Sequence, residues 1–180
     1  SISVPYFWAI AKDRDLTINS KLFASEHPLF LGEYKHVFKD SNLTSNFGYT
    51  GGYKKSSGNK KLGDKSHVFL NFLKNFNETE SINKNFEVKL QHVSDRKYLK
   101  LYKIDSNLVN YGTEVLENSI DYSVINDDKN QFFSLNASAY RSLADNYNDK
   151  YEYVLPEINY EKQLFSDKFG YGNFKSDLKI

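Results

Sequence analysis

The feature that most constrains the fold is the alternation of apolar and polar side chains, which recurs along most of the chain. From Leu16 to Ala24 every second position is apolar apart from Ser20, and 42–54 and 115–125 repeat the pattern. Successive side chains of a strand point to opposite faces, so a period of two predicts strands with one apolar and one polar face. We predict strands at 1–10, 15–24, 29–39, 42–54, 66–76, 84–93, 115–125, 131–143, 151–163 and 172–180.

Strand length and loop length point to a particular kind of sheet. Strands of globular proteins average roughly 5–6 residues, whereas a tilted strand that crosses a bilayer needs roughly 9–11, which fits the predicted segments. Short links are expected at 11–14, 39–42, 77–81, 125–130 and 165–171, and mostly longer connections at 25–28, 54–66, 94–113 and 144–150. Outer-membrane barrels have short turns on one side and longer loops on the other. Helical periodicity is weak throughout, and the best helix candidate is 96–104, within a connection.

We therefore predict an all-β fold, an antiparallel transmembrane β-barrel segment of about ten strands with open edges. The polar strand faces also fit a soluble sandwich, in which they would contact solvent. Lysine and arginine number 24 against 23 acidic residues, so the charge does not favour nucleic acid as a partner. There is no cysteine, hence neither a disulfide nor a thiolate metal site, and no cofactor is expected. Methionine is missing even from position 1, which indicates an internal segment of a longer protein.

Few residues suggest bond chemistry. The four histidines, His27, His36, His67 and His92, have no metal-ligand spacing, and a structural or lumen-facing role is expected for them. The stretch "HVSD" contains a histidine, a serine and an aspartate, the residue types of a nucleophilic triad. Because neighbours on a strand point to opposite faces, this cluster cannot converge without a bulge. We expect no enzymatic activity.

A group of lysines follows the glycine-rich stretch "GYTGGY", whose glycines are interpreted as a twisted strand end. With only Asp64 among them, these lysines predict either a solvated hairpin loop or an outward loop that touches anionic lipid headgroups: Lys54, Lys55, Lys60, Lys61 and Lys65.

Four stretches in the same order and spacing resemble the LptD family of outer-membrane lipopolysaccharide assembly proteins, also called organic solvent tolerance proteins. They are "VPYFWAIAKDRDLTINSKLF", "LGEYKHVF", "VSDRKYL" and "YEYVLPEINY". The first is similar to the family's Pro-Tyr-Tyr-Trp strand, turn and Asp-x-Thr strand. The second and third are similar to its Glu-Tyr/Phe-Arg-Tyr-Leu and Val-Ser-Asp-x-x-Tyr segments. "AKDR" replaces the Pro-Asn turn of many members.

The resemblance implies that residues 1–180 form part of a very large barrel, beginning near its second strand. A periplasmic jelly-roll domain would precede this segment and further barrel strands would follow it. The implied function is non-enzymatic: lipopolysaccharide leaves through a seam between the first and last barrel strands and enters the outer leaflet. The implied partners are lipopolysaccharide, an LptE-like lumen lipoprotein and periplasmic Lpt bridge proteins, in the outer membrane of a Gram-negative bacterium.

Four residues of the first strand have roles in this interpretation. Pro5 matches a proline of the family's early strands, and because proline cannot donate a ladder hydrogen bond, it is expected to ease opening of the seam. Tyr6, Phe7 and Trp8 precede a short turn and are expected in the interfacial aromatic girdle, although adjacent rings cannot all face lipid. The alternatives are a generic outer-membrane porin or barrel hydrolase, and a soluble all-β ligand-binding module.

Overall fold

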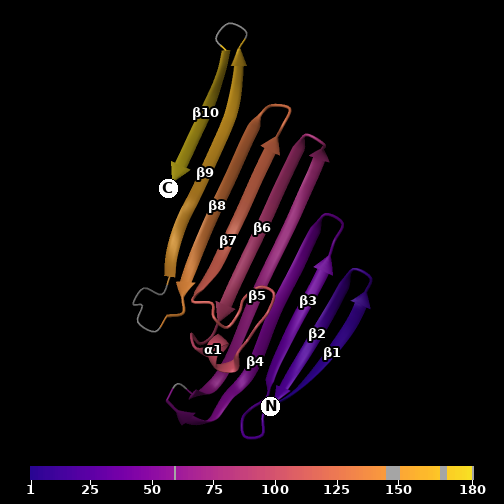
Figure 1. Cartoon of the computed structure of the whole chain (residues 1–180), viewed down its shortest axis with the longest axis vertical. Coiled ribbons are helices and arrows are strands. Elements are labelled where there is room, and N and C mark those ends of the chain that lie inside the picture. Colours follow the sequence, from indigo (N-terminus) through magenta and orange to yellow (C-terminus); the bar gives the residue numbers. More distant parts are fainter. Residues whose placement is uncertain (59, 145–150, 167–169, 180) are drawn as a thin grey trace.

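The computed structural model describes residues 1–58, 60–144, 151–166 and 170–179. All strands of this part of the chain belong to one antiparallel sheet of ten strands in sequence order (Figure 1). The strands are β1 (Ile2–Ala11), β2 (Arg14–Leu22), β3 (Leu29–Val37), β4 (Ser41–Ser57), β5 (Lys60–Thr79), β6 (Ile82–Val93), β7 (Val115–Asn126), β8 (Gln131–Ser142), β9 (Tyr151–Ser166) and β10 (Gly170–Lys179). One short helix, α1 (Tyr98–Tyr102), lies between β6 and β7, within the predicted 96–104 segment.

The sheet is open. Among the described strands, β1 pairs only with β2 and β10 only with β9, so each keeps one unpaired edge. The links after β1, β3, β5 and β7 lie at one end of the sheet, and the connection that carries α1 lies at the other end (Figure 1). The predicted fold class, an antiparallel all-β sheet of about ten strands with open edges, is confirmed.

The largest error in the predicted boundaries concerns the connection expected at 54–66. Strand β4 instead continues to Ser57 and β5 begins at Lys60, so most of this segment extends the hairpin. The pairing shifts on both sides of Gly52, where φ is +81°, a value that glycine adopts without strain. Cross-strand hydrogen bonds satisfy the backbone whatever the side chains are, so a Ser- and Lys-rich segment can remain a strand.

A second correction concerns β9. The alternation predicts Val154 on the apolar side and Tyr153 on the polar side. The pairing with β8 shifts between Asn136 and Ser138, which sets Tyr153 opposite Ala139 and Val154 opposite Ser138. Pro156 lies in the irregular stretch, where the missing N–H of a proline is tolerated.

The buried core is not spread over the sheet but lies at one end of it. Residues 94–114, here named the packed loop, include α1 and fold back onto the sheet beside β4 and β5 (Figure 1). The core cluster combines side chains of the loop with strand residues, namely Tyr98, Leu99, Tyr102, Ile104 and Val109 with Leu29, Tyr53, Phe69, Val93, Leu116 and Leu143. The rest of the sheet is a single layer, so both of its faces are available to surroundings other than the chain itself.

Candidate functional site

One face of the sheet is predominantly apolar and largely exposed. Cross-strand pairing places on this face Val4, Tyr6, Trp8, Ile18, Phe30, Phe47, Tyr49, Val68, Leu70, Phe72, Phe86, Val88, Leu90, Ile120, Tyr122, Phe133, Leu135, Ile158, Tyr160, Phe174 and Leu178. We name it the apolar face. Even on central strands its side chains are half exposed, as with Leu90 at 48% and Ile120 at 47%. An apolar surface that spans ten strands requires a non-aqueous environment or a partner to cover it.

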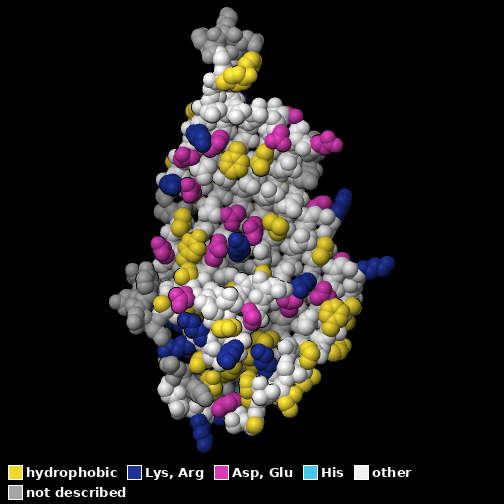
Figure 2. All heavy atoms as spheres, in the orientation of Figure 1, with side chains coloured by type: hydrophobic (Ala, Val, Ile, Leu, Met, Phe, Trp, Pro, Cys, Tyr) yellow, Lys and Arg dark blue, Asp and Glu magenta, His cyan; other side chains and the backbone are white. Residues whose placement is uncertain are grey.

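The opposite face, named the polar face, carries acidic, basic and amide side chains over most of its area, and Figure 2 shows both charge signs distributed across it. A row of polar residues crosses four strands here, because Glu87 pairs with Asp121, Asp121 with Asn136 and Asn136 with Glu157. The Asn136 amide donates to the Asp121 carboxylate, and the Asn71 amide donates to Glu87 at 3.2 Å. Such a face is suited to contact with water or with a polar partner.

Ion pairs on the polar face link neighbours along and across the strands. Lys89 lies 3.8 Å from Glu87 and 3.9 Å from Glu117. Lys175 pairs with Glu161 at 2.6 Å and Lys179 with Glu157 at 3.1 Å. Ion pairs as exposed as these contribute little to stability. Their effect is that positive and negative charges neutralise each other on the polar face.

The packed loop is anchored on the polar face by aromatic side chains. The ring of Tyr98 lies 5.5 Å from that of His67 on β5, and the Tyr98 hydroxyl and His67 Nδ1 form a hydrogen bond of 3.3 Å. Tyr102 contacts Tyr53 at 5.4 Å and Phe23 at 6.3 Å between ring centroids. These contacts join α1 to β4, to β5 and to the connection after β2.

Polar contacts fix the two flanks of the same loop. Asn107 and Asn46 both donate to the Glu33 carboxylate, at 3.2 and 3.1 Å. At the start of the loop, the Ser66 backbone N–H donates to the Ser94 hydroxyl, and the Ser94 N–H donates to the Ser66 carbonyl. The loop thus covers the polar face at the end of the sheet that is remote from the short turns.

Burial changes the ionisation of the loop tyrosines. Desolvation, followed by the neighbouring Tyr102, raises the pKa of Tyr98 far above its ordinary value of 10.0. Desolvation also raises the pKa of Tyr102. Tyr98 therefore keeps its hydroxyl proton at neutral pH and is available as a hydrogen-bond donor to His67.

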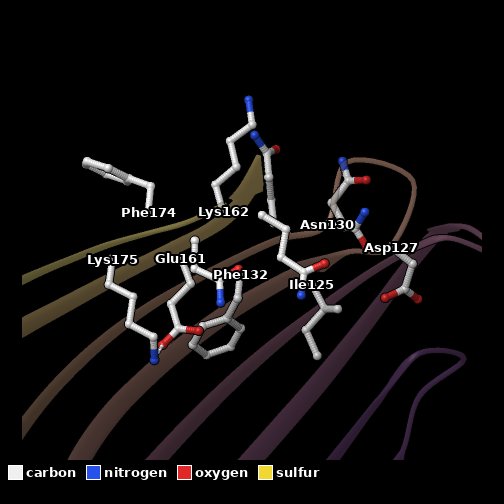
Figure 3. A pocket seen from close by; sticks show the side chains of 12 residues that line it. Ile125, Asp127, Asn130, Phe132, Glu161, Lys162, Phe174 and Lys175 are labelled. Atoms are coloured by element: carbon white, nitrogen blue, oxygen red, sulfur yellow. Dashed lines mark hydrogen bonds and ion pairs between the residues drawn. The ribbon is translucent and has the colours of Figure 1, made fainter. Parts of the chain in front are cut away.

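A surface pocket of about 240 Å³ lies at the short-turn end, between the β7–β8 turn and the strands β9 and β10. Lys162 and Phe174 project to one side of the sheet there, while Glu161, Lys175 and Phe132 project to the other (Figure 3). The first two side chains belong to the apolar face and the other three belong to the polar face.

The predicted residues of the first strand divide between the two faces. Tyr6 and Trp8 lie on the apolar face, with Tyr6 opposite Ile18 and Trp8 opposite Leu16, whereas Phe7 lies on the polar face opposite Thr17. Pro5 also faces the polar side, opposite Asn19, in an edge strand that is exposed along its whole length. The structure thus separates Phe7 from the other two rings.

The predicted lysine loop requires a correction. Lys54 and Lys55 are exposed on β4, and the Lys54 N–H donates to Glu26 at 2.8 Å. Lys65 is instead buried at 3% exposure on β5, where its ammonium lies 3.6 Å from the Asp95 carboxylate of the packed loop. Lys65 therefore belongs to the anchoring of this loop and not to an exposed group. The backbones of Lys60 and Lys61 belong to β5, but their side chains lie outside the described part of the chain.

The histidines do not converge on a common site. His92 is exposed on β6 opposite Val68, on the apolar face, whereas the Asp95 carboxylate contacts Lys65 and accepts from the Lys97 N–H. His36 pairs with Asp13 at 3.1 Å and His67 with Tyr98. Across 1–58, 60–144, 151–166 and 170–179, no group of three or more His, Cys, Asp or Glu side chains is arranged to hold a metal.

Within the described ranges, no helix is both long enough and apolar enough to cross a membrane. No protein-family model matches the chain, and a search of curated proteins finds no match either.

The packed loop is the feature that sequence reasoning missed. The alternation predicted a connection at 94–113 but not its contacts with Glu33, Tyr53 and His67. The sequence signal for this packing is the spacing of Tyr98, Leu99 and Tyr102, because these residues lie on one side of a short helix and are all buried.

Proposed function

We propose that this chain is part of an outer-membrane β-barrel that inserts lipopolysaccharide into the outer leaflet by lateral release through a seam, without bond chemistry. The observation that carries the membrane part is the division of the long antiparallel strands into an exposed apolar face and a charged polar face. A barrel in lipid needs this division, because alternate residues face acyl chains and a wet interior. Short links at one end of the sheet and a long loop at the other agree with barrel wiring.

The lipopolysaccharide part of the proposal is supported by the resemblance of four stretches to the LptD family. These stretches lie on β1 and β2, on β3, at the junction of β6 and the packed loop, and on β9. A sheet of ten strands that remains open would form only part of the circumference of a larger barrel. The lumen of such a barrel accommodates a protein plug, which is the proposed place of an LptE-like lipoprotein, and Lpt bridge proteins would deliver the lipid from the periplasm.

The edge strand β1 is the proposed neighbourhood of the seam. It pairs on one side only among the described strands, and Pro5 has no N–H to donate to a ladder. We propose that Pro5 lowers the cost of parting strands there. Replacing Pro5 with alanine in the complete natural chain should then slow lipopolysaccharide delivery and alter envelope permeability, and an unchanged phenotype would overturn this role.

Two measurements test the main proposal. The protein should co-float with outer-membrane vesicles and should resist extraction by carbonate, because the apolar face requires acyl chains. A photo-crosslinking residue at Tyr6 should trap lipopolysaccharide during transport, whereas the same residue at Ile120, away from the β1 edge, should not. Flotation without trapping would favour a generic outer-membrane barrel, and failure to float would leave the soluble module as the better interpretation.

A further inference from the structure

A small pocket of about 190 Å³ lies on the polar face, where the packed loop meets strands β2 to β5. We name it the loop pocket. The polar side chains that line it come from these strands and from the loop itself, namely Thr17, Asn19, Glu33, Asn46, His67 and Asp105. Ligands of drug size occupy pockets of roughly 300–1,000 Å³, so the loop pocket is sized for a single ring.

Hydrogen bonds hold the walls of the loop pocket in place. The Asn46 amide donates to the Glu33 carboxylate at 3.1 Å, and Asn107 of the packed loop donates to the same oxygen at 3.2 Å. On β2, the Asn19 carbonyl oxygen accepts from the Ser3 hydroxyl at 2.6 Å, so the NH2 group of Asn19 is the end left to donate elsewhere. These bonds fix the pocket before any ligand arrives.

The loop pocket also offers both acceptors and donors that the chain itself does not use. Asn46 is 4% exposed, and its amide oxygen is buried without a hydrogen-bond partner in the described part of the chain. With the Tyr98 hydroxyl as donor to His67 Nδ1, the proton of the neutral imidazole lies on Nε2, which is then a donor. Gly48 leaves room for this imidazole, because a side chain there would collide with it.

Charge favours a neutral ligand over an ion. Lys35 lies 2.5 Å from Glu33, so the carboxylate of the pocket wall already has a basic partner. The described lining residues include no lysine or arginine that could pair with an anion. A hydroxyl group donates one hydrogen bond and accepts others, so a ligand rich in hydroxyls matches a mixture of unused donors and acceptors.

An exposed aromatic ring borders the loop pocket. Phe7 pairs with Thr17 across β1 and β2 and is 63% exposed on the polar face, where acyl chains would not cover it. An aromatic ring provides a broad, rigid apolar surface. The C–H face of a sugar ring packs on such a surface while its hydroxyls reach the polar groups alongside.

We infer that the loop pocket binds one neutral sugar ring of a glycan. The Asn19 amide and His67 Nε2 donate to sugar oxygens, Asp105 and the Asn46 oxygen accept from sugar hydroxyls, and Phe7 covers the C–H face. Two sources carry this chemistry, the saccharide of lipopolysaccharide and a free oligosaccharide that enters the barrel. The inference rests on the proposed wet interior of the barrel but not on lipopolysaccharide as the cargo.

The test uses the complete natural chain in detergent and two probes, maltotriose and the lipid-free saccharide released from lipopolysaccharide by mild acid. Saturation-transfer NMR titrations give the dissociation constant of each probe. We expect binding that Phe7→Ala and Asn19→Ala each weaken by about fivefold, because each change removes one contact of the sugar ring. Tighter binding of the lipid-free saccharide assigns the ring to lipopolysaccharide, and binding of maltotriose alone assigns it to a free oligosaccharide.

The matched controls are Phe165→Ala and Asn159→Ala, which remove a ring of 65% exposure and an amide from the polar face of β9, away from the packed loop. Both should bind the probes as the unmodified protein does, and circular dichroism should show that all variants retain their strand content. If neither probe binds, or if Phe7→Ala and Asn19→Ala change binding no more than the controls, the sugar site is overturned while the proposed membrane function stands. Maltotriose binding without binding of the lipid-free saccharide keeps the site and counts against lipopolysaccharide as the cargo.

Discussion

At the residue scale, the packed loop depends on a few buried polar contacts that connect it to the sheet. Tyr98 and His67 are both buried and form a hydrogen bond with each other, and Lys65 is buried beside Asp95. Burying a polar group is costly unless it has a partner, so each of these contacts is needed once the loop is docked.

Replacing Tyr98 with phenylalanine removes the hydroxyl that contacts His67 and leaves a buried ring nitrogen without that partner. We expect a loss of about 1–3 kcal/mol from the stability of the docked loop, measured as faster amide hydrogen exchange in α1. Tyr111→Phe, in an exposed tyrosine of the same loop, is the control and should change little. Equal exchange in both variants would contradict the importance of the Tyr98 hydroxyl.

Because of the Tyr98 hydroxyl, we expect the docked loop to lose stability at alkaline pH. Because burial raises the pKa of Tyr98 above its ordinary value of 10.0, the unfolded state releases this proton first as the pH rises. The contribution of Tyr98 is therefore fully present below pH 10.0 and is lost progressively above it. Exchange rates in α1 of the unmodified protein should rise above that pH, and Tyr98→Phe should remove part of this dependence.

Asp95→Asn keeps the shape of the side chain but removes the charge opposite the buried Lys65. The variant should lose about 1–3 kcal/mol in the free energy of unfolding, because the buried ammonium keeps its desolvation cost without the carboxylate. Asp105→Asn, in an exposed aspartate of the same loop, is the matched control. Denaturant titrations of the two variants under identical lipid or detergent conditions provide the comparison.

At the element scale, the strands were predictable because alternation is a local property that each segment carries by itself. All ten predicted strands are present, and the short helix lies where the weak helical pattern placed it. Two exceptions coincide with irregular pairing: the β4–β5 hairpin continues beyond the register shifts at Gly52, and an irregularity near Pro156 moves Tyr153 to the apolar face. A bulge changes which residues oppose each other without leaving a periodic signal.

Gly52 should be the least replaceable glycine of the hairpins. Its φ is +81°, and a side chain added there would meet the carbonyl of Gly63 across the strand pair. Gly52→Ala should cost about 1–2 kcal/mol for the backbone conformation alone, with a further steric cost. Gly172→Ala is the control, because open space surrounds that position. Comparable midpoints of thermal unfolding for the two variants would show that the bulge tolerates a side chain.

The two faces of β7 give a direct test of the membrane proposal. Ile120 lies on the apolar face and Ser123 on the polar face of the same strand. Ile120→Lys should destabilise the inserted barrel by about 2–4 kcal/mol, because the lysine would face acyl chains, whereas Ser123→Lys should have little effect. Folding titrations in lipid vesicles distinguish the two variants. Equal tolerance of lysine at both positions is incompatible with a lipid-facing surface.

At the scale of the whole molecule, the fold class and open edges follow from the sequence, whereas the packed loop does not. Its anchors are distant from it along the chain, and no period connects Asn107 with Glu33 or Tyr102 with Phe23. The same holds for Lys65. In the sequence it belongs to a group of lysines expected in one loop, and its burial depends on contacts that form only in the folded chain. The face on which a residue lies was predictable where the strand pairing is regular, but not for Tyr153 or for Tyr53, which packs against Tyr102 of the loop, and the long-range partners were not predictable.

The unpaired edges of β1 and β10 predict the behaviour of residues 1–180 produced alone. Exposed backbone donors and acceptors on an edge strand readily pair with another chain, so the isolated chain in detergent should form oligomers whose size grows with protein concentration. Size-exclusion chromatography with light scattering measures this. A single monomeric species at all concentrations would show that the edges are protected.

The anchoring of the packed loop also determines an order of events during folding. Glu33 and Asn107 are separated by 74 positions in sequence, and the loop must find surfaces made by β3, β4 and β5 before it gains its own contacts. Closing such long segments costs entropy that is recovered only when the receiving strands are already paired. Docking of residues 94–114 is therefore a late kinetic step, and substitutions in the loop should accelerate its undocking while leaving the rate of hairpin formation unchanged.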